Sequence, residues 1–304
     1  MSRSTAALTS GALPAPGAVL ELFKPITWFP PMWAFGCGVI SSGVDLSERW
    51  AMALAGLLLA GPLVCATSQA VNDWFDREVD AINEPHRPIP SGRIPGRWGL
   101  WIAIAWTCVS MAWALALGPW VFGAACVGMA MAWAYSAPPF RFKQDGWLGP
   151  AACAVCYEGV AWFTGAAVMT GALPNIEIVT LAALYSVGAH GIMTLNDFKA
   201  IEGDRLTGIR SLPVQLGVGK AARIASVVMA VPQVAVVALL LSWDRPLHAL
   251  AVAALLGAQG FAMARLIRDP AKYTPWYNGT GVLLYVLGML VSAFAVSGLA
   301  GAHG

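Results

Sequence analysis

The chain has 304 residues, of which 58% are hydrophobic and only 11% are charged, and its formal net charge is +2. Soluble domains carry about 25% charged residues, so this composition, with a mean hydropathy of +0.66, excludes an ordinary soluble protein and indicates one embedded in a lipid bilayer. So small a net charge gives no sign of nucleic-acid binding, and we expect no nucleic-acid partner.

Apolar stretches long enough to cross a bilayer recur along the whole chain. A transmembrane helix needs about 20 mostly apolar residues, and a backbone in hydrocarbon must satisfy its polar groups within the helix. We therefore expect an all-α, polytopic bundle of about nine transmembrane helices. The expected spans are residues 26–44, 50–71, 98–117, 120–136, 147–169, 176–195, 221–241, 247–267 and 277–298.

The start of the chain differs in composition from the rest, being rich in Ser, Ala, Gly and Pro. We interpret residues 1–20 as a disordered N-terminal tail and residues 21–304 as a single transmembrane domain. Of the 18 Lys and Arg residues, only Arg49 and Arg245 fall in loops on the side opposite the tail. By the positive-inside rule the N-terminus lies in the cytoplasm, and an odd number of spans puts the C-terminus in the periplasm.

Acidic residues concentrate in two cytoplasmic loops, each directly after a predicted span. The segment 72–80 aligns with the segment 196–204, about 124 positions further on. This similarity suggests an internal duplication, which membrane proteins often show, with two related halves that face a single site. The two loops hold eight of the 16 acidic residues, namely Asp73, Asp76, Glu78, Asp80, Glu84, Asp197, Glu202 and Asp204.

The spacing of these acids predicts a cation site. On a helix continuing out of the membrane, Asp73, Asp76 and Asp80 share one face, and Asp197 and Asp204 stand two turns apart on one face. Clustered carboxylates repel one another, and oxygen-only ligands suit Mg²⁺. Because Mg²⁺ usually fills its remaining positions with water and substrate phosphates, the segments predict a Mg²⁺-bridged diphosphate. One such segment could be a solvated helix end, but two matching copies disfavour that interpretation.

Basic residues surround the same face of the membrane. Arg binds phosphate oxygens through two donors, and Lys binds them as a point charge. Topology alone also places Lys and Arg on this side, so each contact with phosphate is a separate prediction. We predict diphosphate binding by Asn72, Arg77, Arg87, Tyr135, Arg141, Lys143, Asn196, Lys199 and Arg205.

Two ionisable side chains lie inside predicted spans. Glu158 is the only acidic residue deep within a span. An intramembrane carboxylate is a functional candidate, although a neutral or hydrogen-bonded structural role is equally open. His190 lies six residues before Asn196. A lone His in a span is more often a packed helix residue than a ligand, so its role also stays open.

The sequence resembles the intramembrane prenyltransferases of the UbiA superfamily, and within it the chlorophyll and bacteriochlorophyll synthases most of all. The likeness covers nearly the whole chain from about residue 20. The strings that carry it are KPITWFPP at 24–31, NEPHRPIPSG at 83–92, TLNDFKAIEGDR at 194–205 and PWYNGTG at 275–281.

This resemblance implies nine helices around a cavity capped by cytoplasmic loops. The sequence departs from the pattern of the superfamily at one position. In many members the second motif is DxxxD, whereas here Ile201 stands four residues after Asp197, so Glu202 and Asp204 are the available acids. The implied catalytic residues are Asp73, Asp76, Asp80, Asp197 and Asp204. The implied metal ligands are Asn72, Asp73, Asp76, Asp197 and Asp204, with Mg²⁺ as the cofactor.

The implied reaction esterifies the propionate of bacteriochlorophyllide with a geranylgeranyl or phytyl group and releases diphosphate. Mg²⁺ and basic residues would stabilise charge on the leaving group. A carboxylate nucleophile is already ionised at neutral pH, so no strong general base is needed. The implied location is the inner or intracytoplasmic photosynthetic membrane, where other pigment-biosynthesis or photosystem assembly proteins are candidate partners.

Two alternatives remain at this point. Another superfamily member, with a quinone-precursor or haem acceptor, would share both Asp-rich segments. A secondary transporter is disfavoured because transporter sites lie near the bilayer midplane in broken helices, whereas these acids lie at span ends beside arginines.

Overall fold

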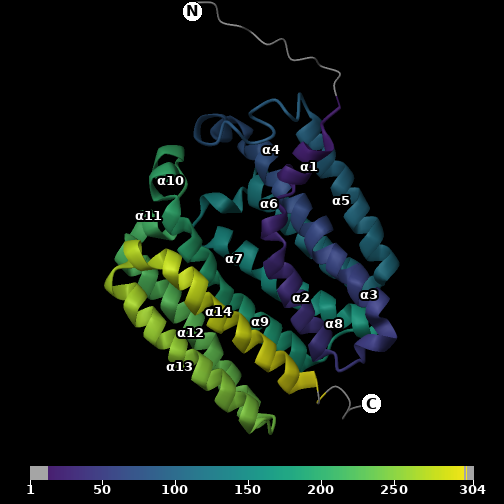
Figure 1. Cartoon of the computed structure of the whole chain (residues 1–304), viewed down its shortest axis with the longest axis vertical. Helices are drawn as coiled ribbons and strands as arrows, with labels where there is room; N and C mark the ends of the chain where they lie inside the picture. The colour runs from purple at the N-terminus through teal and green to yellow at the C-terminus, as the bar shows by residue number, and fades with distance from the viewer. Residues whose placement is uncertain (1–12, 298, 300–304) are drawn as a thin grey trace, which may run out of the picture.

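The computed structural model describes residues 13–297 and 299, which form helices and no β-strand (Figure 1). The expected all-α fold is therefore confirmed. Seven helical segments in the described residues are long and apolar enough to cross a membrane. They are Leu46–Asn83, Trp98–Leu117, Leu148–Thr170, Ile176–Lys199, Val218–Ser242, Pro246–Arg268 and Pro270–Ser297.

The two other predicted spans also fall on helices. α2 covers Phe29–Ser41 with 13 residues, and α6 covers Pro119–Ser136 with 18 residues. Neither meets the length and hydropathy of the seven segments above, so the count of nine spans stays a prediction.

The first half of the chain supplies α1 to α6. Part of the segment predicted as a tail is helical here, because α1 begins at Pro16 and buries Ala18 and Leu22, while residues 1–12 lie outside the described residues. The helices are α1 (Pro16–Leu22), η1 (Pro25–Thr27), α2, α3 (Leu46–Leu58), η2 (Leu59–Cys65), α4 (Ala66–Asn83), α5 (Trp98–Leu117) and α6.

The second half supplies η3 to α14. These elements are η3 (Phe142–Gln144), α7 (Leu148–Ala154), η4 (Val155–Val160), α8 (Ala161–Thr170), α9 (Ile176–Asn196), η5 (Asp197–Lys199), α10 (Ile201–Thr207), α11 (Leu212–Leu216), α12 (Val218–Ser242), α13 (Pro246–Arg268) and α14 (Pro270–Ser297).

Local sequence explains several of the helix boundaries. Gly118 has a φ of +124°, which favours glycine, and Pro119 begins the next helix, so α5 and α6 are joined by a very tight turn. Within the continuous segment from α3 to α4, Pro62 lacks a backbone N–H and lies in the π-helical stretch η2.

The centre of the bundle is formed by α8 and α9. In each of the two segments that contain these helices, 61% of the residues in the most apolar 18-residue stretch are buried. The corresponding share in α5 is 17%, so α5 lies at the periphery of the bundle. α2 packs closely on α8 because glycine replaces larger side chains at the contact: Gly38 lies against the backbone of Trp162, and Gly165 against the backbone of Phe35.

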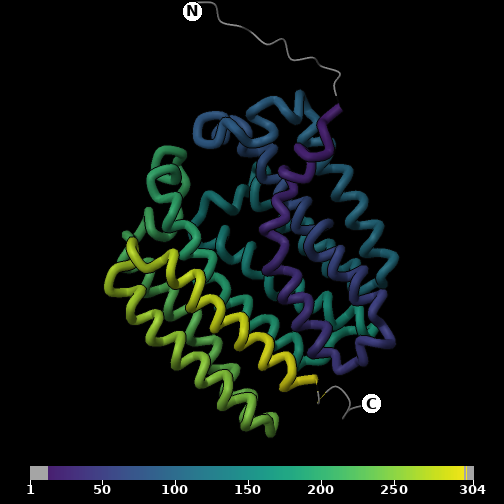
Figure 2. The backbone as a smooth tube through the Cα atoms, viewed as in Figure 1, coloured from purple at the N-terminus to yellow at the C-terminus, as the bar shows by residue number. Residues whose placement is uncertain are grey.

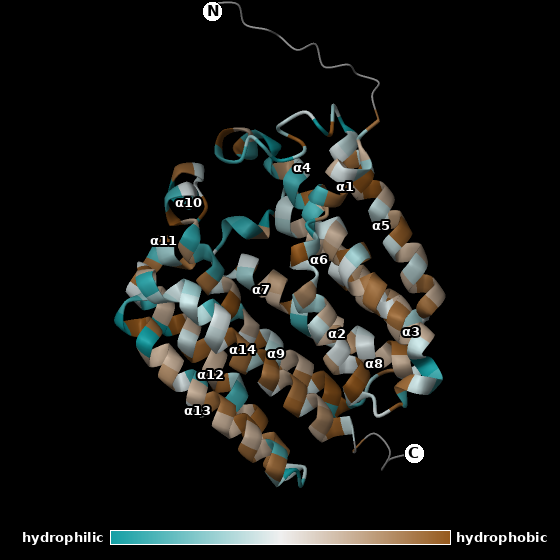
Figure 3. Ribbon diagram, in the orientation of Figure 1, coloured by the Kyte–Doolittle hydropathy of each residue, from teal (hydrophilic) through white to brown (hydrophobic). Residues whose placement is uncertain are grey.

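Polar residues gather at one end of the bundle. Figure 3 shows this polar end around the loops beside α1, the C-terminal part of α4 and the region of α10 and α11, with apolar residues along the remaining helix lengths. Exposed apolar side chains on α13 include Leu247, Leu250 and Phe261. The tube in Figure 2 shows α10 standing out at the same end as the C-terminus of α4. Both Asp-rich segments therefore lie at the polar end.

Candidate active site

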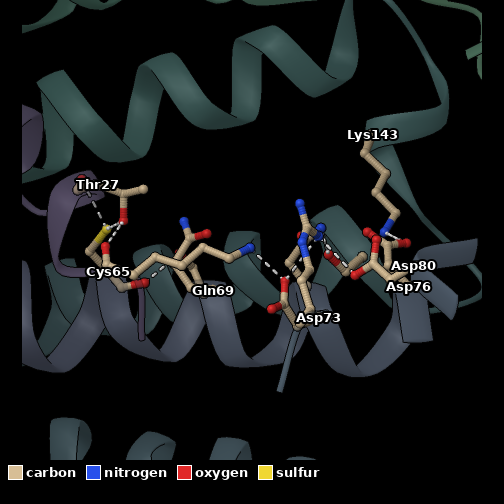
Figure 4. Close-up of polar contacts among 12 residues, drawn as sticks. Thr27, Cys65, Gln69, Asp73, Asp76, Asp80 and Lys143 are labelled. Atoms are coloured by element: carbon tan, nitrogen blue, oxygen red, sulfur yellow. Dashed lines mark hydrogen bonds and ion pairs between the residues drawn. The ribbon is translucent and has the colours of Figure 1, made fainter. Parts of the chain in front are cut away.

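The first Asp-rich segment belongs to a single unbroken helix. α4 continues to Asn83, and Asp73, Asp76 and Asp80 follow one another along it, as Figure 4 shows. The predicted common face for these three acids is therefore present. Each of the three carboxylates is paired with a basic side chain from another part of the chain.

Asp73 is the most deeply buried of the three acids, with 2% of its surface exposed. Lys24 donates from Nζ to its Oδ1 at 2.6 Å, and Nη1 of Arg87 lies 3.7 Å from the same oxygen. Oδ2 is also buried and has no hydrogen-bond partner in the described residues. Because a buried polar atom without a partner is costly, this oxygen is suited to a further donor or a cation.

Asp76 and Asp80 have their own partners. Lys143, on η3, donates from Nζ to Oδ1 of Asp76, and Arg87 donates from Nη1 to Oδ2 of Asp80 at 2.8 Å. Burial lowers the pKa of Lys143 below its ordinary value, and the neighbouring Asp76 carboxylate opposes that shift. The first segment is therefore a row of three carboxylates held in place by three cations.

The second segment differs from its prediction. Asp197 and Asp204 do not share one helix face, because α9 ends at Asn196 and the chain breaks at Ala200, with a φ of −113°, between η5 and α10. Oδ2 of Asp204 accepts a hydrogen bond from Ser211 Oγ at 2.6 Å. Burial raises the pKa of Asp204, and this hydrogen bond opposes the shift.

No ion pair in the described part of the chain involves either acid of the second segment. The two segments nevertheless approach one another through the loop after α6. Lys143 of η3 binds Asp76, and the Gln144 carbonyl accepts a hydrogen bond from the backbone N–H of Arg210, six residues after Asp204, at 2.9 Å. This shared loop is consistent with one site between the segments.

Two of the predicted diphosphate ligands hydrogen-bond to other groups of the chain. Arg77 donates from Nη1 to the Trp74 carbonyl at 2.8 Å, and its guanidinium lies 4.4 Å from the centre of the Trp74 ring. Asn72 donates from Nδ2 to Ser136 Oγ at 3.2 Å, which ties α4 to the end of α6.

The other predicted ligands lie at or near the polar end without a defined role. Arg141 precedes η3 in a left-handed conformation, with a φ of +43°, and its Nε is buried without an acceptor in the described residues. Asn196, Lys199 and Arg205 are exposed. The structure therefore brings Arg87 and Lys143 to the acids more directly than it does these residues.

Lys24 is a site residue that the sequence-based prediction did not include. It lies 49 positions before Asp73 and directly before Pro25, with a φ of +45°. One signal could have identified it: a lysine at the cytoplasmic entrance to the first predicted span, within the string 24–31 that carries the family resemblance. Its contact depends on tertiary packing, because α1 packs against α4 through a cluster that includes Leu22 and Val71.

Below the row of acids lies a cavity of about 210 Å³, bounded by α2, η2, α4, α6 and the segment α7–η4–α8. The wall from residue 59 to residue 72 spans about 20 Å at about 1.5 Å per residue. The cavity is therefore long enough for an extended apolar chain.

Polar side chains of the cavity lie toward its acid end. Asn72 and Tyr135 line it near the acids, and Gln69 donates from Nε2 to the Tyr157 hydroxyl at 3.2 Å. Deeper positions are apolar or small, including Leu59, Ala60, Val64, Ala124, Ala125, Gly128 and Val160. The shape and polarity fit a ligand with a charged head and a long apolar tail.

The donor atoms along the row of acids are oxygens, the type that Mg²⁺ prefers. In the described residues, no three side chains of the types His, Cys, Asp and Glu are grouped as a ready metal site. A site of that kind is not required, since Mg²⁺ commonly takes one or two carboxylates and completes its shell with water and phosphates. The oxygen donors and the partnerless Oδ2 of Asp73 fit such a site.

The chain is similar to known proteins in both sequence and fold. The profile of the UbiA prenyltransferase family matches residues 27–287. The chain is 60% identical over 288 residues to the bacteriochlorophyll synthase 33 kDa chain of Cereibacter sphaeroides, covering 95% of each chain. It is 54% identical to the protein of the same name from Rhodobacter capsulatus, covering 94% of this chain and 95% of the other.

A solved structure shares the fold. The structure of a UbiA homolog from Archaeoglobus fulgidus bound to GPP and Mg²⁺ superimposes with a TM-score of 0.72 at 21% identity, covering 90% of this chain and 99% of the other. At this identity the match shows the fold alone, but the family profile and the close relatives agree with it. The chain belongs to the UbiA prenyltransferase family and is a membrane-embedded prenyl-transferring enzyme.

Proposed function

We propose that this enzyme transfers a geranylgeranyl or phytyl group from its diphosphate to the propionate carboxylate of bacteriochlorophyllide, and releases diphosphate. The acceptor is supported by the names of two relatives that are 60% and 54% identical over nearly their full lengths. A member of another branch would share the Asp-rich segments, but such high identity to bacteriochlorophyll synthases favours the tetrapyrrole.

The observation that carries the proposal is the row of three acid–cation pairs at the entrance of an elongated apolar cavity. A prenyl diphosphate has matching parts, because its head is anionic and its tail is a long hydrocarbon. With the head beside Lys24 and Lys143, the tail would extend along the cavity toward Leu59. The same walls would exclude water from the reacting carbon.

The proposed Mg²⁺ ligands are Asn72, Asp73 and Asp76 in the first segment, and Asp197 and Asp204 in the second. When bound, Mg²⁺ would offset the charge that develops on the leaving diphosphate. Asp73 supports the assignment best, since its Oδ2 is buried and has no partner within the described residues.

The basic side chains have a complementary part in the proposed reaction. Lys24, Arg87 and Lys143 would bind phosphate oxygens, and the three carboxylates hold them in position before substrate arrives. The acceptor carboxylate has an ordinary pKa near 4 and is ionised at neutral pH. The mechanism therefore assigns no general base.

The membrane arrangement is proposed as well. The bias of Lys and Arg supports a cytoplasmic polar end. The names of the relatives support the inner or intracytoplasmic photosynthetic membrane as the location. The similarity of the two Asp-rich segments supports one transmembrane domain of two related halves. The polar end carries both Asp-rich segments (Figure 3). The proposed periplasmic C-terminus concerns residues 300–304, which lie outside the described residues.

The test is esterification of bacteriochlorophyllide by the detergent-purified protein with geranylgeranyl diphosphate. We expect product with Mg²⁺, none with excess chelator, and recovery when Mg²⁺ is restored. Product formation that is unaffected by chelator would overturn the metal assignment. If bacteriochlorophyllide is not esterified but an aromatic acid acceptor is prenylated, the assignment of the acceptor is wrong, while the prenyltransferase activity is retained. A parallel reaction with phytyl diphosphate determines the donor preference.

A further inference from the structure

A second hollow, of about 860 Å³, opens on the outside of the bundle. It is bounded by α6, the segment α7–η4–α8, α9 and α12, and we call it the outer groove. Its walls are formed by apolar side chains such as Val127, Val155 and Val187. These three valines are between 40% and 55% exposed, so the groove is open toward the surroundings of the helices.

The outer groove lies next to the donor cavity. Ala124 and Val160 line both spaces, so a single layer of side chains separates them. Aromatic side chains flank the groove at Trp120 and Trp147. A ligand here would be apolar, would enter from the lipid, and would lie beside the proposed prenyl chain.

Among the residues that the structure describes, His190 is the only ionisable side chain that lines the outer groove. The other polar side chain, Ser186, already donates from Oγ to the Ala182 carbonyl at 2.8 Å. Nε2 of His190 lies 3.2 Å from the Trp147 carbonyl, and the two rings are 5.7 Å apart at 32°. The imidazole is thus fixed at one nitrogen by a backbone carbonyl.

This arrangement resembles that of a metal-ligating histidine. Such residues usually donate one ring N–H to a carbonyl or carboxylate, which fixes the tautomer and leaves the other nitrogen as the ligand. The hydroxyl of Thr194 is 3.5 Å from Nδ1 of His190 but donates to the His190 carbonyl at 3.0 Å. With the proton on Nε2, Nδ1 keeps a lone pair free for a metal.

The position of His190 also suits an acceptor. Asp197 follows seven residues later, directly after the C-terminus of α9 and about 10 Å along the helix axis. Trp147, which contacts His190 from the start of α7, follows Lys143 by four residues, and Lys143 binds Asp76. A broad ligand centred at His190 would carry a peripheral carboxylate toward the diphosphate site.

We propose that the outer groove binds the tetrapyrrole acceptor, with a nitrogen of His190 as the axial ligand of its central magnesium and Trp147 packed against the macrocycle. This inference rests on the proposed function. A lipid acyl chain would pack against the apolar walls but would make no specific bond to the imidazole. A planar magnesium macrocycle would pack against the walls and the tryptophan, and its metal would bind the imidazole nitrogen.

The experiment compares binding of bacteriochlorophyllide with binding of the same macrocycle without magnesium, using full-length protein and no prenyl donor. We expect the wild type to bind the magnesium form about tenfold more tightly, the lower end of what supporting groups contribute at metal sites. His190→Ala should lose this preference, and added imidazole should restore it. His248→Ala, at the start of α13 and outside the groove, is the matched control and should keep the preference.

His190→Phe provides a second variant, because it keeps a ring against Trp147 and removes only the nitrogens. Resonance Raman bands that report the coordination of the central magnesium should change in both His190 variants and not in the control. An unchanged preference in both variants, or no preference in the wild type, would overturn the inference, as would a tightly held lipid in the groove that the pigment does not displace. Wild-type protein that fails to esterify bacteriochlorophyllide at all would refute the proposed function instead.

Discussion

The first Asp-rich segment continues α4 as one helix to Asn83, whereas the second breaks into η5 and α10 directly after α9. The acids of the first segment each have a basic partner. In the second segment, Asp204 has only the Ser211 hydroxyl, and its pKa is raised by burial. Two stretches of similar sequence therefore differ in both backbone and charge balance.

The difference suggests separate roles for the two segments. Lys24 and Lys143 already compensate the first segment, so its carboxylates serve partly to position cations that can bind phosphate. The second segment has excess negative charge among the described residues, so a bound cation would be stabilised more strongly there than at the first segment. We expect variants of the first segment to fail at any Mg²⁺ concentration, and variants of the second to depend on Mg²⁺ concentration.

The largest effect is expected for Asp73→Asn. Removing this charge leaves Lys24 without its partner and removes a proposed metal ligand, so turnover should fall at least about 100-fold, or about 2.7 kcal/mol in activation free energy. Added Mg²⁺ should not restore it. The measurement is initial rate in the esterification assay over a range of Mg²⁺ concentrations, with folding checked by thermal unfolding.

The matched control for Asp73→Asn is Glu78→Gln, an exposed acid on the same helix, which should retain nearly full turnover. Near-normal rates for Asp73→Asn in a folded protein would contradict the role given to the first segment.

Asp197→Asn should produce an equally large loss at low Mg²⁺ but a smaller one at high Mg²⁺. The reason is that this acid has no basic partner in the described residues, so its loss weakens cation binding without leaving another side chain unpaired. The Mg²⁺ concentration for half-maximal rate should rise about tenfold or more. Glu202→Gln, an exposed acid nearby, is the control. If both Asp variants respond to Mg²⁺ alike, the two segments do not differ in role.

Lys143→Met should have a smaller effect, confined mainly to the donor. Loss of one charge-assisted contact to phosphate costs about 1.5–3 kcal/mol, so we expect KM for the prenyl diphosphate to rise about tenfold with a lesser change in kcat. Lys199→Met removes an exposed lysine of the second segment and should change KM little. Equal effects of the two substitutions would show that net charge, and not the contact with Asp76, determines donor binding.

Much of the fold could be predicted because it depends on local composition. The expected span 98–117 coincides with α5, and the acids of α4 share the predicted face. The break after Asn196 was not predictable, because the chain departs from helix at Ala200, a residue that ordinarily favours helices.

The candidate site was less predictable than the fold, because its ion pairs join distant positions. Lys24 and Asp73 are 49 residues apart, and Lys143 and Asp76 are 67 apart. A sequence shows that basic residues accumulate on this side of the membrane, but topology alone explains that accumulation. Only the three-dimensional structure, which packs α1 against α4 and brings Lys143 of η3 to Asp76, distinguishes the two lysines from exposed ones such as Lys199.

The smallest effect is expected where the loop after the first segment is fastened to α1. Arg93 donates from Nη2 to Oε1 of Glu21 at 2.8 Å and to the His86 carbonyl at 2.6 Å. The hydrogen bond from Arg93 lowers the pKa of Glu21 from its ordinary value of 4.5. The stabilisation of the fold by this ion pair is therefore fully present above pH 4.5, and it is lost as the pH falls through the lowered pKa of Glu21.

Arg93→Gln tests this contact by thermal unfolding at several pH values. Because the pair is exposed and screened by solvent, we expect a decrease in Tm of a few degrees at most at neutral pH, which disappears in acid. The second segment has no corresponding ion pair in the described residues, so Arg205→Gln, at an exposed arginine of α10, should show no such pH dependence. A decrease in Tm for Arg93→Gln that persists in acid would mean that the bond to the His86 carbonyl, and not the charge of Glu21, holds this loop.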